Sequence, residues 1–404
     1  MVQSILNWYN KNAKFLKATA TLTGTVIGAG ILGVPYVVSK TGFLYGSLII
    51  LLIGIVFLYL NLFLAEIALR TKGKHQLSGY VERYLGPWGK RGMTFSMMVG
   101  IYGALTAYLI GEGESIRALL IQIPMIANVL PTIFLEPVFL SILFFSLCTI
   151  IILLGINQLG KAELLVVTFM IAVLLLICSL SISKIQMSYL SYSNAKEIFF
   201  PLGVVIFAFI GSAAIPEMEE ILGKNKKQFK KAVVYGTLTP VVLYLFFCLT
   251  VIGTIGFHNF ETLAANERIA TIALSQFISP TLGVLANILA ILAMFTSFIT
   301  LGVALVEMYD YDYGMSRMWS VVLTLAIPLL ALLFNLTTFI SALAITGIVA
   351  GGIDGILIVL AFWKAKLLGN RKPEFSLSKN IAVGYTIIAI FLFGMLQQLY
   401  VSLI

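Results

Sequence analysis

Long apolar runs separated by short polar segments make up most of the chain. The runs are roughly 20 residues long, and they are continuous, whereas a membrane β-strand alternates apolar and polar positions. In lipid, a helix satisfies every backbone N–H and C=O group internally. The pattern therefore predicts an all-α membrane protein with eleven spans, near residues 15–38, 43–69, 93–121, 133–155, 160–182, 198–222, 231–256, 279–308, 317–334, 337–364 and 380–403.

Composition agrees with that class of protein. Hydrophobic residues make up 60% of the 404 residues, charged residues 11%, and the mean hydropathy is +1.03. A soluble domain carries roughly 25% charged residues. The net charge of +9 lies in short loops between the runs, so it predicts no nucleic-acid surface. The three cysteines all fall inside apolar runs, and we expect neither a metal site nor a disulfide from them.

The basic residues predict the orientation. With a cytoplasmic N-terminus and an outside C-terminus, all but five of the 26 lysines and arginines fall in inside segments, as the positive-inside rule requires. The five exceptions are Lys40, Arg117, Lys184, Lys196 and Arg268.

Two spans carry matching breaks. Gly30 lies five residues before Pro35 in the first span, and Gly211 lies five residues before Pro216 in the sixth. Breaks at corresponding places in two halves indicate a transporter's binding site, although glycine and proline also serve packing in membrane helices. Five helices per half predict an inverted repeat within one transporter domain (1–404). Its halves would be 15–182 and 198–364, with 380–403 as an additional helix.

An unwound segment in mid-membrane frees backbone groups that lipid cannot satisfy. The half-helix that follows points its N–H groups and positive dipole end at the cavity, which suits a carboxylate. The carbonyls that end the preceding half-helix suit an ammonium group or a hard cation. Since neither break contains Lys, Arg, Asp or Glu, this backbone chemistry indicates a zwitterion as substrate.

Several segments resemble known permeases. The run GTVIGAGILGVPY from Gly24 to Tyr36 is similar to the first helix of the amino acid/auxin permeases and of the hydroxy and aromatic amino acid permeases. The segment 102–108, and Thr296-Ser297-Phe298 with the residues 301–304, resemble the tyrosine and tryptophan permeases, and 207–218 is closer to the amino acid/auxin side. The resemblance covers essentially the whole chain and implies the LeuT-type fold of the amino acid-polyamine-organocation superfamily.

The resemblance also implies a substrate site. The substrate carboxylate would meet the N–H groups of Gly28, Ala29 and Gly30, and the amine would meet carbonyls near Thr25, Val26 and Phe207. The third, sixth and eighth helices would select the substrate side chain. Their candidate residues are Tyr102, Thr106, Phe207, Ile210, Gly211 and Ser212. For Tyr102 and Phe207, ordinary helix packing is an equally good interpretation.

The resemblance implies a coupling-ion site as well. Sodium-coupled members of the fold bind one ion between first-helix carbonyls and an eighth-helix pattern that is matched here by Ala293, Thr296 and Ser297. Gly24 and Ile27 would supply the carbonyls. Mid-helix hydroxyls can instead bond the carbonyl four residues back. Some proton-coupled relatives use a fifth-helix lysine here, but an alignment through Ala162 and Glu163 puts Met170 at that position.

Acidic residues inside spans are costly and usually functional. Asp354 has no basic residue within a helical turn, so it is the first candidate for a proton or gating role. Glu66 is a second candidate, with a helix-spaced ion pair to Arg70 as the alternative. The carboxylates within 217–220, together with the basic loop from Lys224, are a candidate cytoplasmic gate.

Together these observations predict a multi-pass plasma-membrane secondary transporter. It would import neutral, hydrophobic or aromatic amino acids by cation symport with alternating access, sodium being favoured. No enzyme motif is present, and we expect no cofactor, nucleic acid or obligate protein partner. A proton-coupled permease and a transporter-like amino-acid sensor remain the alternatives. Sensors usually add a long soluble tail, and the tails here are about 14 and 1 residues, which favours transport.

Overall fold

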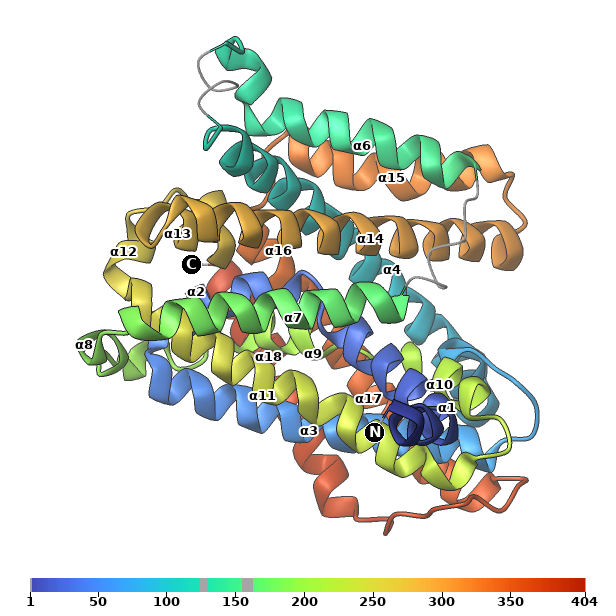
Figure 1. Cartoon of the computed structure of the whole chain (residues 1–404). Coiled ribbons are helices and arrows are strands. Elements are labelled where there is room, and N and C mark those ends of the chain that lie inside the picture. Colours follow the sequence, from blue (N-terminus) through green and yellow to red (C-terminus); the bar gives the residue numbers. More distant parts are fainter. Residues whose placement is uncertain (1, 124–128, 155–162, 404) are drawn as a thin grey trace.

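A computed structural model describes residues 2–123, 129–154 and 163–403, and among these residues there are helices but no β-strand (Figure 1). The long helices are α3 (Phe43–Arg70), α4 (Leu77–Leu120), α6 (Pro137–Leu154), α7 (Glu163–Ser181), α11 (Phe229–Ile255), α14 (Pro280–Tyr313) and α18 (Ile381–Leu403). The helices of the interrupted spans are α1 (Val2–Val26) and α2 (Gly30–Thr41), α9 (Leu202–Phe209) and α10 (Ala214–Leu222), and α16 (Phe339–Thr346) with α17 (Gly352–Leu368).

Within the described residues, nine helical segments are long and apolar enough to cross a membrane, or ten when the bent pair α1 and α2 counts as one span. The shorter apolar helix α15 (Arg317–Leu333) occupies the place of the predicted ninth span. The count of eleven therefore stays a prediction. The predicted boundaries at residues 155 and 160, with Lys161 and Ala162 beside them, lie outside the described residues.

The connections contain short helices. They are α8 (Met187–Leu190), α12 (Phe257–Glu261), α13 (Ala270–Phe277) and the 3₁₀ turns Thr132–Leu135, Ile182–Lys184, Ala195–Glu197, Lys226–Gln228 and Ala265–Glu267.

Two helices differ from the predicted spans. The third predicted span begins sixteen residues earlier, at Leu77, because the helix kinks at Gly86 instead of ending there. Gly86 has a φ of 76°, which glycine adopts readily. In the tenth span, a π-helical turn (η7, Gly347–Gly351) separates α16 from α17. Such turns occur often at functional sites.

The outer surface is apolar. On α3, Leu44, Leu48 and Ile55 are 63%, 55% and 52% exposed, and their helical spacing places them on one face. This is the face that lipid would cover. The opposite face of α3 packs against α11 and α17, and α4 packs against α6, α14, α16 and α17. At one edge of the bundle α6 and α15 lie side by side (Figure 1).

Candidate functional site

The first span is broken in its middle. α1 ends at Val26, α2 begins at Gly30, and the two axes differ by 55°. Inside the break, the Gly28 N–H donates to the Val26 carbonyl at 2.9 Å. Among the described residues, the N–H groups of Ala29 and Gly30 have no recorded acceptor. These two N–H groups at the start of α2 are free to meet a ligand, as the sequence predicted for a broken helix.

The sixth span is interrupted between α9 and α10, at residues 210–213. Within the described part of the chain, no acceptor is recorded for the N–H groups of Gly211, Ser212 and Ala213. Both interruptions thus lie where the glycine and proline pattern predicts them.

The two breaks are in contact. A Cβ on Gly30 would lie 2.8 Å from the Ala208 Cα, and a Cβ on Gly211 would lie 2.5 Å from Val26 Cγ2. Real Cβ atoms do not approach other atoms so closely, so glycine is required at both positions for this approach. The free N–H groups of both breaks consequently belong to one region of the protein.

A tyrosine that the sequence analysis did not single out joins the breaks. Tyr244 of α11 is fully buried, and its hydroxyl lies 2.7 Å from the Val26 carbonyl oxygen and 2.8 Å from that of Ala208. These carbonyls end the half-helices α1 and α9. A buried tyrosine hydroxyl needs a hydrogen-bond partner. The position of Tyr244 in the middle of an apolar span was therefore the sequence feature that could have indicated this contact.

The predicted carboxylate position is open. A Cβ on Gly28 would meet a single atom within 4 Å, the Ser297 Oγ at 3.9 Å. The buried Tyr108 side chain lies near Ser297 as well. The structure therefore brings Gly28 of the first break, Tyr108 of α4 and Ser297 of α14 together. Tyr108 belongs to the segment 102–108 but was not among the predicted site residues.

The other predicted substrate residues lie in different surroundings. The Tyr102 hydroxyl lies 2.7 Å from that of Tyr309 and donates to the Leu323 carbonyl at 3.2 Å, so its polar end binds α14 and α15. The Thr106 hydroxyl bonds the Tyr102 carbonyl, and that of Thr25 bonds the carbonyl of Thr21, each within its own helix. The side chain of Phe207 lies beside Gly30.

The residues predicted for the ion site come from α1, the first break and α14. The Thr296 hydroxyl donates to carbonyls of its own helix, Leu292 at 3.0 Å and Ala293 at 3.2 Å. This is the alternative that mid-helix hydroxyls offer, and it leaves oxygen lone pairs free. Ile27 is buried in the first break, and Gly24 packs against Val167 of α7. In α7, Met170 is buried as well.

Glu66 is a buried structural anchor. Its carboxylate is fully buried and accepts from Arg70 Nε at 2.7 Å, from Lys366 Nζ and from the backbone N–H of Leu377 at 2.7 Å. The helix-spaced pair with Arg70 is therefore present. The carboxylate also ties α3 to α17 and to the segment that leads into α18.

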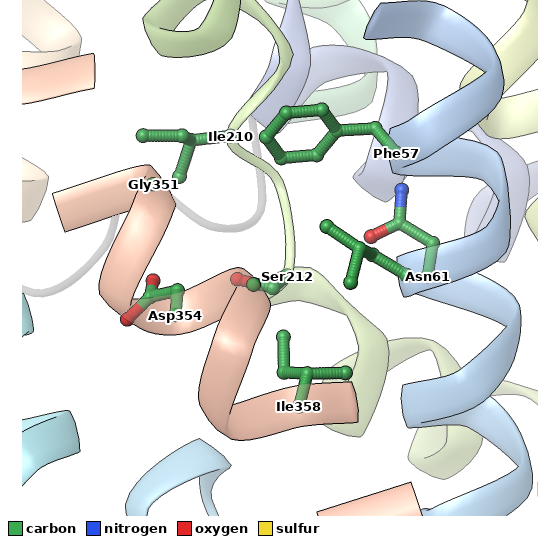
Figure 2. A pocket seen from close by; sticks show the side chains of 9 residues that line it. Phe57, Asn61, Ile210, Ser212, Gly351, Asp354 and Ile358 are labelled. Atoms are coloured by element: carbon green, nitrogen blue, oxygen red, sulfur yellow. The ribbon is translucent and has the colours of Figure 1, made fainter. Parts of the chain in front are cut away.

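Asp354 lines a small cavity with Asn61 and Ser212, between α3, the second break and α17 (Figure 2). The cavity has room for roughly one water molecule. The structure thus places Asp354, which lies twelve residues before Lys366, next to the break of the sixth span.

Polar contacts are present at both ends of the region around the breaks. At the α2 end, Arg268 donates to the Tyr36 hydroxyl at 2.8 Å, and that hydroxyl donates to Glu261 at 3.0 Å. At the α10 end, Lys74 pairs with Glu220 at 2.8 Å, and Tyr80 donates to Glu219 at 3.1 Å. Glu219 also pairs with Lys226. In the candidate gate predicted for residues 217–220, Glu219 thus pairs with the basic loop that follows Lys224, as the prediction requires, while a gating role stays a prediction.

Comparisons with known proteins agree with this geometry. Residues 11–401 match the model of the tryptophan/tyrosine permease family. Glutamine transporter 2 of Aliivibrio fischeri is 24% identical over 381 residues, which cover 90% of this chain and 91% of the relative. Tyrosine-specific transport system 1 of Haemophilus influenzae is also 24% identical over 381 residues, covering 89% and 90%.

Among solved structures, the crystal structure of MhsT in complex with L-phenylalanine is similar, with a TM-score of 0.71 and 16% identity. The match covers 95% of this chain and 98% of MhsT. This likeness confirms the predicted LeuT-type fold.

Proposed function

Because the chain belongs to the tryptophan/tyrosine permease family, we propose that this multi-pass membrane protein imports a neutral amino acid through its two broken helices. The observation that carries the proposal is the contact between the breaks, with free N–H groups at Ala29 and Gly30 and with no Lys, Arg, Asp or Glu in either break. A zwitterion brings its own two charges, and helix ends can match both.

The carboxylate is expected on the N–H groups of Gly28, Ala29 and Gly30. Open space beside Gly28 supports this position. The ammonium group is expected near the carbonyls of Thr25, Val26 and Phe207. Since the Val26 carbonyl already accepts from the Tyr244 hydroxyl and from the Gly28 N–H, the amine would replace one of these two donors there.

A hydrophobic or aromatic side chain is the expected preference. Phe207 beside Gly30, with Ile210 in the second break, supports an apolar contact for the substrate. The similarity to tyrosine-specific transport systems supports an aromatic substrate, and the similarity to a glutamine transporter supports a polar, uncharged one. The roles of Tyr102, Thr106, Gly211 and Ser212 in side-chain selection are part of the same proposal.

The coupling cation is expected to be sodium, held by carbonyls of Gly24, Ile27 and Ala293 and by the hydroxyls of Thr296 and Ser297. These are neutral oxygens, which suit a hard monovalent cation. The proximity of Ser297 to Gly28 supports coupling, because ion and substrate would then share one region. Proton coupling through Asp354 is the second candidate, favoured by the position of Asp354 beside the second break.

Transport would proceed by alternating access, with the repeats 15–182 and 198–364 moving around the breaks in the plasma membrane. Closed polar contacts at both ends support such a cycle, since each set can open in turn.

The test is uptake into proteoliposomes of labelled tyrosine, tryptophan, phenylalanine and glutamine, with an imposed sodium or proton gradient and empty liposomes as the control. We expect saturable, gradient-driven uptake of at least one amino acid. Binding without uptake under either gradient would instead identify a transporter-like sensor.

A further inference from the structure

The cavity at Asp354 is lined by three polar side chains from three separate elements. Asn61 comes from α3, Ser212 from the second break and Asp354 from α17, immediately after the π-helical turn. In Figure 2 Ser212 lies between the Asp354 carboxyl and the Asn61 amide. Any movement of the second break would therefore change this cavity.

Two oxygen atoms that border the cavity lack a protein partner. Asn61 is fully buried, and its Nδ2 donates to the Thr237 hydroxyl at 3.1 Å, which leaves its Oδ1 unpaired. Asp354 Oδ1 is also buried and unpaired. An unpaired buried polar atom costs about 1–3 kcal/mol, so native proteins rarely leave one without a partner or a water.

One water molecule would satisfy this set. It would donate its two protons to Asn61 Oδ1 and Asp354 Oδ1 and accept from the hydroxyl of Ser212. A buried water typically makes about three hydrogen bonds, and the cavity has room for roughly one water.

The hydroxyl of Ser96 on α4 gives no support to an ionised Asp354. It donates its single proton to the Ala350 carbonyl, four residues before Asp354, at 2.8 Å, so that proton is already used. A buried carboxylate oxygen without a donor or an opposite charge favours the neutral, protonated carboxyl.

We propose that Asp354, Asn61 and Ser212 form a proton-binding site in which one ordered water links the Asp354 carboxyl to the break of the sixth span. The link between this site and substrate binding rests on the proposed amino-acid transport. The protonated carboxyl itself does not depend on transport.

Within the described residues, Asp354 has no ion-pair partner that would compensate its charge when it ionises. Along α17 the next charge is Lys364, about 15 Å further on at 1.5 Å per residue. On α3 the nearest is Glu66, which is occupied by its own partners, and on α4 it is Arg91, about 7.5 Å along the axis from Ser96. On α18 the titratable residues are Tyr385, which is 61% exposed, and Tyr400, which is fifteen residues further along the helix.

Ionisation would therefore oppose closure of the break. A buried carboxylate without a partner is far more costly than a neutral carboxyl, so the ionised form requires the cavity to open to water. Since Ser212 and Ile210 belong both to the cavity lining and to the break, substrate-induced closure would favour proton uptake. By reciprocity, protonation would favour substrate binding.

The first test is infrared spectroscopy of the full chain in lipid nanodiscs. The difference between wild type and Asp354→Asn at neutral pH should contain a protonated-carboxyl band that shifts in D₂O. Absence of that band would overturn the proposal whether or not the protein transports amino acids.

The second test measures tyrosine affinity against pH at constant sodium. Wild-type affinity should fall by about tenfold per pH unit on the alkaline side, since one proton is linked to binding. Asp354→Asn should be flat. Glu112→Gln, which removes another buried carboxyl outside the cavity, should keep the wild-type slope. Equal slopes in wild type and Asp354→Asn would overturn the coupling.

Asn61→Leu keeps the carboxyl but removes one partner of the water. The ionised form then loses solvation, so the fall in affinity should move to higher pH. Asn61→Leu remains a test if Asp354→Asn cannot be purified in a folded form. An Asn61→Leu protein whose affinity depends on pH as in the wild type would contradict the proposed proton-binding site.

Discussion

The hydroxyl of Tyr244 lies 2.7 Å from the carbonyl oxygen of Val26, the last residue of α1, and 2.8 Å from that of Ala208 near the end of α9. One side chain of α11 thus donates to the carbonyl ends of both broken helices. The hydroxyl carries one proton, which the two carbonyls share.

Tyr244→Phe should destabilise the protein by about 1–3 kcal/mol, because two buried carbonyl groups lose their donor. The thermal midpoint of the purified protein should fall and substrate affinity should weaken. Tyr235→Phe is the matched control on the same helix, since Tyr235 is 58% exposed. Equal midpoints for the two variants would show that the bridge contributes nothing.

Glu66→Gln should lower stability by about 3–5 kcal/mol, since removing one partner of a buried ion pair leaves uncompensated charge on Arg70 and Lys366. The ion dependence of uptake should stay unchanged. Glu82→Gln breaks an exposed pair with Lys90 and should cost less than about 1 kcal/mol. Wild-type stability together with altered ion dependence would instead support a gating role for Glu66.

The helices and the two breaks were predictable from the sequence for physical reasons. Apolar runs of spanning length leave few alternatives to helices in lipid, and Gly30 and Gly211 mark places where two backbones approach. The π-helical turn at 347–351 was not predicted, because nothing in a continuous apolar run distinguishes it from α-helix.

Side-chain partners were harder to predict. The pairing of Tyr244 with Val26 joins residues 218 positions apart, so it depends on how helices pack. The hydroxyl of Tyr102, a predicted substrate residue of α4, pairs with that of Tyr309 of α14. Tyr108, six residues later, faces Ser297 instead. Helical spacing alone does not tell which of these faces meets the break.

Topology is tested by labelling with a membrane-impermeant thiol reagent. Lys227→Cys should react from the cytoplasmic side and His258→Cys from outside, because both positions are exposed at opposite ends of α11. The three native cysteines are buried and should give little background. Reaction of both from one side would refute the predicted orientation and the inverted repeat.

Ser297→Ala tests sodium coupling. Loss of one buried polar partner costs about 1–3 kcal/mol, so half-maximal sodium should rise roughly five- to a hundredfold while uptake recovers at high sodium. Thr300→Ala removes an exposed hydroxyl one turn away and should behave as wild type. Uptake that follows a pH gradient without sodium, and that is insensitive to Ser297→Ala, would contradict the sodium assignment.

Calorimetric titration of Gly28→Val tests whether the amino acid binds at the break of the first span. A Cβ on Gly28 meets no protein atom closer than 3.9 Å, so a side chain there fills space kept for the ligand. Gly211→Val is a weaker test, since its Cβ would collide with Val26. We predict that Gly28→Val keeps the thermal midpoint of the wild type and shows no binding of the amino acid that the wild type binds. Retained wild-type affinity in Gly28→Val would show that the amino acid does not bind at the break of the first span.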